Sequence, residues 1–361
     1  MMRRVLLCLL LAFALTLPTL ATDFSDEFGT ERVEQAAPSA AKEILDGVRT
    51  ESDAAGTGLA RLADALRAHF ADALKEALRP VAEIVAVCLL CSLGESFNIG
   101  AKSSLDAVAL GGSLAVAVIG TGDVQSVLSL GTEVLAELSD FSKVLLPTLT
   151  TAAAASGAAG SAAAAYAASA LFSDLLVTAA ERLILPMLCA YTAAAVSAAV
   201  LGDRRLDGAV KLLQWCVKTL MKALVLSFTA YLGMTGILAG AADAAAVKAA
   251  KTVVGTLPVV GKLLGDAATA LVAGAGLLRA AVGVYGMLAC LAAVLLPVLL
   301  LGLRCLLFRA AAAVCSGFAS ERQTKLIASL GSAYGMLLGL IASGAAVELL
   351  AVISLIRTVT T

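Results

Sequence analysis

The side chains best able to do chemistry in this chain stand in one apolar stretch, from Ala241 to Gly302. A charge at the centre of a membrane helix costs about 2.5 to 3.5 kcal/mol on insertion scales, so charges in such a stretch need water, a partner or the membrane interface. We interpret five of them as lining an aqueous path or contacting a partner protein; the simpler alternative is that they anchor helix ends at the interface. The five are Lys248, Lys251, Lys262, Asp266 and Arg279.

Residue types suited to catalysis or metal binding are sparse. Asp266 follows a glycine, as in intramembrane aspartyl proteases, but those enzymes need a second aspartate on a facing helix, and Asp243 falls in an interfacial stretch. His69, the single histidine, lacks a second ligand of metal-site spacing. Cys88 and Cys91 have redox or metal spacing, yet they lie in an apolar helix, where free cysteine usually acts as a small packing residue. With no Walker or Gly-x-Ser-x-Gly motif either, we expect no enzyme, no metal and no cofactor.

Prolines and glycines divide the stretch around these charges. Pro258 removes a backbone donor and restricts its predecessor, and Gly261 permits the turn that follows. We therefore predict two broken helices flanking a turn, with Asp266–Arg279 as a re-entrant segment. Gly283 is predicted to be a packing position, and Pro297 a kink in the next span.

A second set of small residues recurs every four positions near the C-terminus: Gly331, Gly335 and Gly339. This small-xxx-small stripe predicts a close contact between two helices. The contact can lie within one subunit or between the subunits of a homo-oligomer.

Composition sets the class of protein. The chain has 361 residues, 60% of them hydrophobic and 15% charged, with a mean hydropathy of +0.95, whereas soluble domains are about 45 to 50% apolar. The formal net charge of -1 and the absence of a dense basic cluster exclude a nucleic-acid partner. We predict an all-α polytopic membrane protein.

The N-terminal region differs from the rest in charge. Arg3 and Arg4 precede a short apolar run that ends near Ala21, which predicts a signal peptide at residues 1–21, with an uncleaved anchor as the alternative. Residues 22–80 hold 19 of the 53 charged residues and form an extracytoplasmic helical arm. Residues 81–361 form the membrane domain.

Apolar segments near the roughly 20 residues that a bilayer requires predict six full spans: Val81–Phe97, Leu105–Gly122, Leu175–Leu201, Ala223–Gly240, Val282–Leu303 and Leu326–Ile356. Thr148–Ala170, rich in Ala, Ser, Thr and Gly, is predicted as a buried hairpin and forms the second partial segment beside Asp266–Arg279. Eight full spans are the alternative.

Charge patterning assigns the flanking helices to sides of the membrane. The segment Val124–Leu145 has one apolar face and an acidic opposite face, which is typical of an interfacial or partner-binding helix outside the cytoplasm. The positive-inside rule places Gly202–Lys222 in the cytoplasm, together with a second basic region that contains Arg304, Arg309, Arg322 and Lys325. Lys248, Lys251 and Lys262 cannot lie on the cytoplasmic side with these two basic regions if every predicted segment crosses the membrane.

The ordered series from Asp243 through Lys248, Lys251, Leu257-Pro258-Val-Val-Gly261 and Asp266 to Leu278-Arg279, Gly283 and Leu296-Pro297 resembles the stage III sporulation protein AE family of endospore-forming bacteria. The likeness extends over most of Leu171–Gly344. It implies a multi-pass protein of the mother-cell membrane, facing the forespore. It also implies partners, namely the other stage III A proteins and forespore protein Q, and a complex that spans the two membranes.

Two functions follow from these patterns. The first is a non-enzymatic component of a channel or secretion complex that supports the forespore after engulfment. The second is a stand-alone secondary transporter whose substrate path contains Lys262, Asp266 and Arg279. A transporter predicts two matched broken segments, and Thr148–Ala170 shares no charge pattern with Pro258–Arg279.

Overall fold

A computed structural model describes the backbone of residues 30–45, 54–97, 102–202, 204–255 and 260–357. It describes the side chains of the same ranges except at residues 30, 54–55, 96–97, 102–106, 204, 234–275, 277–279 and 357. Every element in these ranges is helical: α2 (Thr30–Ala36), α3 (Ser39–Ile44), α4 (Ala54–Phe97), α5 (Lys102–Ala155), α6 (Ala159–Ala179), a π-helical turn (Ala180–Ile184), α7 (Leu185–Leu201), α8 (Arg204–Gly255), α9 (Val260–Cys315) and α10 (Glu321–Arg357).

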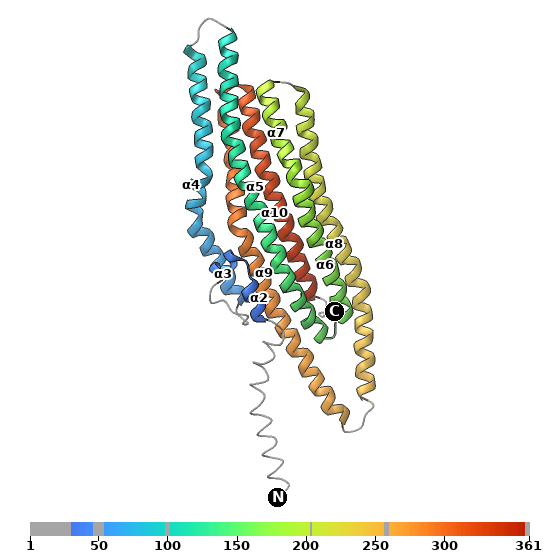
Figure 1. Cartoon of the computed structure of the whole chain (residues 1–361). Coiled ribbons are helices and arrows are strands. Elements are labelled where there is room, and N and C mark those ends of the chain that lie inside the picture. The colour runs from blue at the N-terminus through green and yellow to red at the C-terminus, as the bar shows by residue number, and fades with distance from the viewer. Residues whose placement is uncertain (1–29, 46–53, 98–101, 203, 256–259, 358–361) are drawn as a thin grey trace.

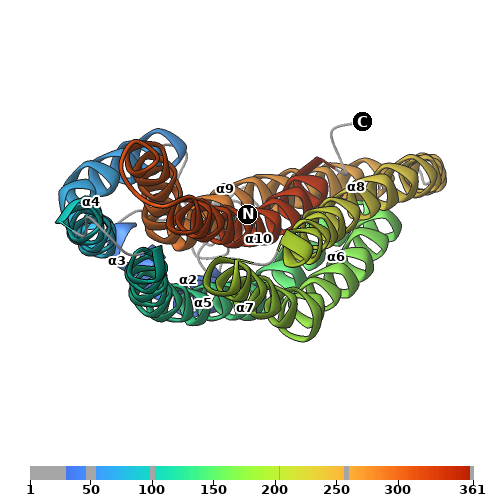
Figure 2. The same cartoon turned by 90° about the horizontal axis from the view of Figure 1, so that it is seen from above.

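The long helices form an up-and-down bundle in which consecutive rods run in opposite directions (Figure 1). Helices α6 and α7 make one rod, joined through the π turn. Helix α10 is the centre of the packing, because it contacts α5, α6, α7, α8 and α9, as the view from above also indicates (Figure 2). Tyr334, Leu337 and Ile341 on this helix are fully buried.

Capping residues and glycines mark where the long helices begin and end. Ser320 and Gln323 form a reciprocal capping box at the start of α10, since the Gln323 N–H donates to Ser320 Oγ and the Ser320 N–H donates to Gln323 Oε1. Gly157 and Gly202 adopt φ values of 95° and 66°, the left-handed region that glycine tolerates best, at the end of α5 and after α7. These residues fix where the chain reverses.

Helix α9 continues where the sequence predicted separate segments, and three of the long helices contain an internal proline. Proline lies inside α4 at Pro80, inside α5 at Pro147 and inside α9 at Pro297. The predicted re-entrant segment Asp266–Arg279 is wrong as a separate element, because it belongs to the uninterrupted α9. Packing along the rod outweighs the single backbone hydrogen bond that each proline removes. Near Pro186 the backbone instead widens into the π turn, an arrangement that accommodates the ring.

The predicted hairpin Thr148–Ala170 does reverse the chain, between the end of α5 and the start of α6. Its two arms are the ends of long helices, so it is not an independent short segment. The Ser156 Oγ is buried in this turn and donates to the Ala153 carbonyl. The hydroxyl group buried in this turn therefore finds its hydrogen-bond acceptor in the backbone of the turn itself.

The bundle is an all-α polytopic membrane protein whose rods exceed the thickness of a bilayer. Five helices of the described chain are long and apolar enough to cross a membrane: Gly56–Glu95, Ala107–Ala155, Ala159–Leu201, Ala280–Cys315 and Glu321–Ile356. They overlap five of the six predicted spans, and the sixth, Ala223–Gly240, lies partly outside the described side chains. Helix α5, with 54 residues, is about 80 Å long, against about 30 Å of hydrocarbon. Much of each rod must extend beyond the hydrocarbon core.

The two ends of the bundle differ in charge and in the turns they carry. The α7–α8 and α9–α10 connections lie at one end, which we call the basic end, and they bring Arg205, Arg322 and Lys325 to the same side (Figure 1). The ends of α8 and α9 that flank residues 256–259 lie at the opposite end, together with α2 and α3; we call it the arm end. This alternation resolves the predicted conflict, because the stretch around Lys248 and Lys262 need not share a side with the basic loops.

The N-terminal arm folds back on the bundle. Val33 and Ala37 are buried around α2, as are Ala41 and Ile44 on α3, and these helices contact α5 and α9. Ser39 Oγ donates to Glu137 Oε1 of α5 at 3.1 Å. The arm is thus part of the folded body.

The acidic helix predicted at Val124–Leu145 has a different partner from the one expected. Its apolar face is buried inside the chain, at Val124, Val127, Leu128, Val134, Leu135, Leu138, Phe141 and Leu145. It is the middle of α5 and packs against α9 and α10. The prediction of an interfacial or partner-binding helix is therefore wrong for this face, although Glu133 and Asp140 remain exposed.

Candidate functional site

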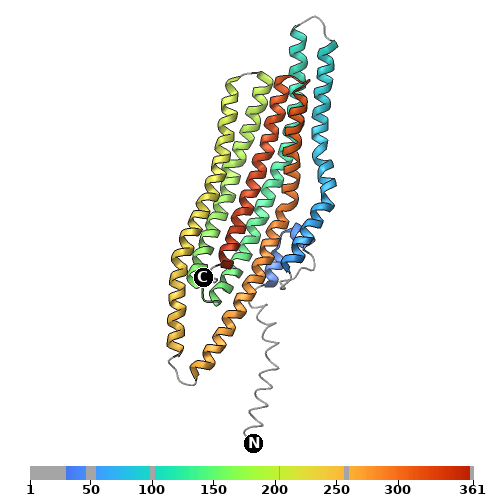
Figure 3. The same ribbon diagram turned by 180° about the vertical axis from the view of Figure 1, so that it is seen from behind.

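The five predicted site residues lie on the parts of α8 and α9 that extend toward the arm end. The backbone of these helices passes beyond the α5–α6 turn in both Figure 1 and Figure 3. Lys248 and Lys251 lie near the end of α8, and Lys262 and Asp266 near the start of α9, so the topology brings both pairs to the arm end. Arg279 lies farther along α9. The side chains of all five are outside the described residues.

The predicted packing glycines lie at real helix contacts. A Cβ on Gly331 would lie 3.3 Å from Phe308 Cβ and 3.4 Å from the Arg309 backbone nitrogen, and one on Gly335 would lie 3.4 Å from Cys305 Sγ. A Cβ on Gly339 would lie 3.3 Å from the terminal carbon of Met221. The stripe therefore packs against α9 and α8 of its own chain, which selects the intramolecular alternative.

Of the four other predicted structural positions, three lie in α9 and one lies outside the described residues. A Cβ on Gly283 would clash with the Ile356 side chain, so Gly283 is a close contact between α9 and α10. Pro297 lies inside α9. Pro258 is outside the described residues, and Gly261 belongs to the first turn of α9.

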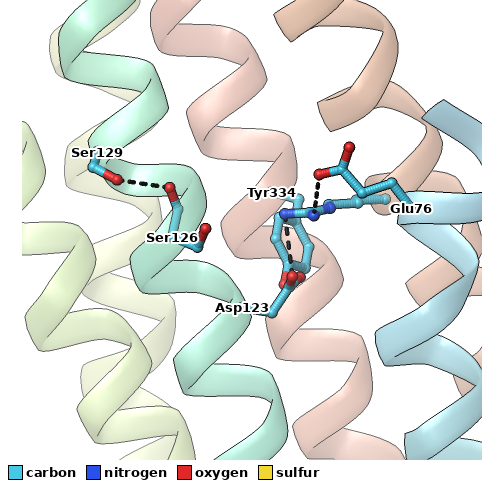
Figure 4. Close-up of polar contacts among 6 residues, drawn as sticks. Glu76, Asp123, Ser126, Ser129 and Tyr334 are labelled. Atoms are coloured by element: carbon cyan, nitrogen blue, oxygen red, sulfur yellow. Dashed lines mark hydrogen bonds and ion pairs between the residues drawn. The ribbon is translucent and has the colours of Figure 1, made fainter. Parts of the chain in front are cut away.

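A buried arginine, Arg304 of α9, organises the main polar cluster of the described bundle. Figure 4 labels the other members of this cluster, Glu76, Asp123 and Tyr334. Its Nη2 lies 3.1 Å from Glu76 Oε1 of α4, and its Nη1 lies 3.2 Å from Asp123 Oδ1 of α5. Tyr334 of α10 donates its hydroxyl to Asp123 Oδ2. Four helices are therefore joined through one guanidinium and two carboxylates.

Exposure within this cluster falls from one side to the other. The Glu76 side chain is 62% exposed, that of Asp123 is 14% exposed and that of Arg304 is 6% exposed. Water reaches Glu76, whereas Arg304 and Asp123 rely mainly on each other, since an unpaired buried charge is strongly destabilising. Arg304 Nε and Nη1 are buried without a hydrogen bond of good geometry, so the guanidinium is held chiefly by charge.

This position corrects the sequence interpretation of Arg304. The residue was expected in a basic cytoplasmic region with Arg309, Arg322 and Lys325, but it points into the bundle and pairs with acids on two other helices. Asp123 and Tyr334 were missed altogether. The sequence signal at Asp123 is a polar residue between two apolar runs. Its partner becomes evident only once the positions of α4, α5, α9 and α10 along one another are known.

A second buried acid, Glu348 of α10, lies nearer the arm end. Glu348 is 5% exposed, and Ser173 Oγ of α6 donates to Glu348 Oε1 at 2.6 Å. Ser142 Oγ of α5 is also buried and lies beside this carboxyl group, but it makes no hydrogen bond of good geometry. No cation of the described chain forms an ion pair with Glu348, so hydroxyl groups alone meet this carboxyl group.

The cysteines of the motif Cys88-Leu-Leu-Cys91 lie beside a third thiol. Cys88 of α4 and Cys315, the last residue of α9, are both buried and lie next to each other, and all described cysteines are free. Within the described ranges, no group of three His, Cys, Asp or Glu side chains has the arrangement of a metal site. The thiols join α4 to α9 at the basic end.

These clusters do not assemble a nucleophile with an adjacent base; they connect helices through buried charge and hydroxyl groups. Comparison with known proteins adds one finding. The family of stage III sporulation protein AE matches residues 41–359. No curated protein and no solved structure shows significant similarity.

Proposed function

Because the chain belongs to the stage III sporulation protein AE family and has five described helices able to cross a membrane, we propose that it is a non-enzymatic component of a channel or secretion complex. The complex would connect mother cell and forespore and sustain forespore development after engulfment. Its place would be the mother-cell membrane that faces the forespore. The other stage III A proteins and forespore protein Q would be its partners.

The observation that supports this proposal best is the length of the rods. Helices α8 and α9 contain 52 and 56 residues, so each is about 80 Å long, well beyond the hydrocarbon thickness. By the positive-inside rule, the basic end faces the cytoplasm and the arm end projects outside. A rigid helical body outside the membrane is suited to bridging the space between two membranes.

The five predicted residues then acquire a specific role. Lys248, Lys251, Lys262 and Asp266 would contact a partner protein or line the aqueous path at the projecting arm end, and Arg279 would lie closer to the membrane. Charges at such a position are solvated before assembly, so they carry no membrane insertion cost. Pro258 and Gly261 would shape the turn that presents them.

The first test is deletion of the gene in the sporulating organism. We expect small forespores with low late-stage reporter output after engulfment, and recovery of both in a complemented strain. Forespores of normal volume and reporter output would contradict the proposal.

Alanine replacements of Lys248, Lys251, Lys262 and Asp266, one at a time, test the arm end. Each should abolish complementation and co-purification with the partner proteins while membrane abundance stays unchanged. Lys143, an exposed surface cation on α5 that pairs with Asp140, provides the matched control. Full complementation by the four variants would reduce these residues to interface anchors.

The transporter alternative has lost its main structural expectation. Transporters of that kind place substrate sites at discontinuous helices. Asp266 and Arg279 instead belong to a continuous helix, and Thr148–Ala170 is the turn between two long rods. The channel-complex proposal needs no such break.

A further inference from the structure

A small cavity opens at the basic end, between α7, α8 and α10. Its volume is about 200 Å³. One wall is apolar, formed by Ala195, Ala198, Ala199 and Val210, and the rim carries charges of both signs. The charged rim residues are Asp207, Glu321, Arg322 and Lys325.

The cation on this rim with the greatest freedom to bind an anion is Arg322. Among the described residues it forms no ion pair, whereas Lys325 Nζ lies 2.8 Å from Glu321 Oε1. The Arg322 guanidinium packs against Gly202, and its Cζ lies 2.9 Å from the position that a Cβ there would occupy. Gly202 therefore holds a planar, doubly donating group at the cavity, a geometry suited to a phosphate.

The acid on this rim with spare capacity is Asp207. Its Oδ2 lies 4.0 Å from Lys325 Nζ, the limit of an ion pair, and its side chain is 42% exposed. Lys325 is engaged closely by Glu321, so Asp207 has room for a second cation. The rim thus offers one site for an anion and one for a cation.

The surroundings of the cavity carry exposed apolar side chains. Leu201 precedes Gly202 and is 70% exposed, and Leu212, two residues after Val210, is 60% exposed. Trp215, one turn farther along α8, is 63% exposed, and exposed tryptophan is typical of the headgroup layer. A ligand in this cavity can therefore keep its apolar part among exposed leucines.

We propose that this cavity binds the headgroup of a zwitterionic phospholipid with a primary amine, of the phosphatidylethanolamine type. Arg322 holds the phosphodiester, Asp207 holds the ammonium group, and the alanine wall contacts the glycerol. The limited volume disfavours a trimethylated amine. Tyr191, which donates to the Ser329 carbonyl at 3.0 Å, ties α7 to α10 behind the site, so the lipid would stabilise the junction of α7, α8 and α10.

The test uses the full-length purified protein, delipidated in detergent and offered phosphatidylethanolamine, phosphatidylglycerol or phosphatidylcholine with identical acyl chains. Retained lipid per protein is measured by native mass spectrometry. We expect preferential retention of phosphatidylethanolamine, and a loss of about tenfold in Arg322→Gln and in Asp207→Asn, as removal of a charge-assisted hydrogen bond predicts. Lys143→Gln, which removes a cation far from the cavity, should retain the lipid as the unmodified protein does.

The alternatives give different results. Equal retention of all three lipids by the unmodified protein, which needs no variant to fold, overturns the proposal. Preference for phosphatidylglycerol with no effect of Asp207→Asn identifies a simple anion site and also overturns it. Competition by free phosphoethanolamine at the same concentration as the lipid would indicate a soluble ligand instead.

Discussion

Arg304 links α9 to acids on two other helices, and the two pairs differ in exposure. The pair with Asp123 is nearly buried, while the pair with Glu76 faces water. Breaking a buried pair typically costs about 3 to 5 kcal/mol, because the remaining charge has no partner, whereas an exposed pair contributes about 1 kcal/mol or less. Loss of the buried pair should therefore destabilise the fold more than loss of the exposed pair.

We predict that Arg304→Ala lowers the thermal stability of the purified protein strongly, and that Glu76→Gln lowers it only slightly. The measurement is the midpoint of thermal unfolding in one detergent for both variants. Arg79→Ala is the control, because Arg79 is 84% exposed and pairs only with Glu83 in the described chain. If Arg304→Ala matched this control, the cluster would not hold the bundle together.

Glu348 leads to a prediction of another kind, because no cation of the described chain compensates it. A neutral amide keeps the oxygen that accepts from Ser173 and adds a donor that can reach Ser142. Glu348→Gln should therefore preserve the thermal midpoint. Glu348→Ala should lower it, since it leaves the buried Ser173 hydroxyl group without its acceptor, at about 1 to 3 kcal/mol. Equal losses in the two variants would mean that a carboxylate charge is required.

At the scale of helices, the glycine stripe of α10 predicts a graded response to added methyl groups. Gly331→Ala should destabilise, because the neighbouring Arg309 backbone cannot move aside as a flexible side chain can. Gly339→Ala should be tolerated better, because the terminal methyl group of Met221 can turn away.

Gly302→Ala supplies the matched control for this series. No atom lies within 4 Å of a Cβ at that position on α9, and alanine is the better helix former by about 1 kcal/mol. We expect a small gain in thermal midpoint for Gly302→Ala and a loss for Gly331→Ala. A gain in both would mean that α9 and α10 are not in close contact at Gly331.

The sequence predicted the faces of the helices better than it predicted their continuity, and the reason is physical. Periodicity identified the apolar face of α5, although not its partners, and the glycine stripe of α10, since both repeat at the helical spacing. Continuity through Pro80 and Pro297 was not predictable in the same way. The local rule counts one lost hydrogen bond, whereas neighbouring rods supply packing along the full length of the helix.

At the scale of the whole molecule, partners across the bundle were the least predictable feature. The sequence predicts Arg304 as one member of a basic loop, because it shows only the neighbours of Arg304 along α9. Its pairing with Asp123 depends on the register of separate rods, set by many apolar contacts. Charge counts alone nevertheless predicted that the two basic loops share a side, and the alternation of six rods brings both to the same end.

That alternation distinguishes the bundle from the eight-span alternative. In the bundle, the start of α8 and the α9–α10 connection lie at the same end, so Gly208 and Gly317 should both face the cytoplasm. Eight successive crossings would put Gly208 outside and Gly317 inside. We predict that single cysteines at these two positions, in a chain whose eight native cysteines are replaced, react with an impermeant maleimide only after the membrane is permeabilised.

Glu133→Cys in the same background is the positive control, because Glu133 is exposed on the part of α5 that leads to the arm end, which either arrangement puts outside the cytoplasm. It should react in intact cells. Labelling of Gly208→Cys in intact cells, with Gly317→Cys protected, would overturn the six-rod topology and the cytoplasmic position of the α7–α8–α10 cavity with it. Protection of both glycine positions beside a labelled Glu133→Cys would place the long helical body on the outer side, where a partner from the opposing membrane can reach it.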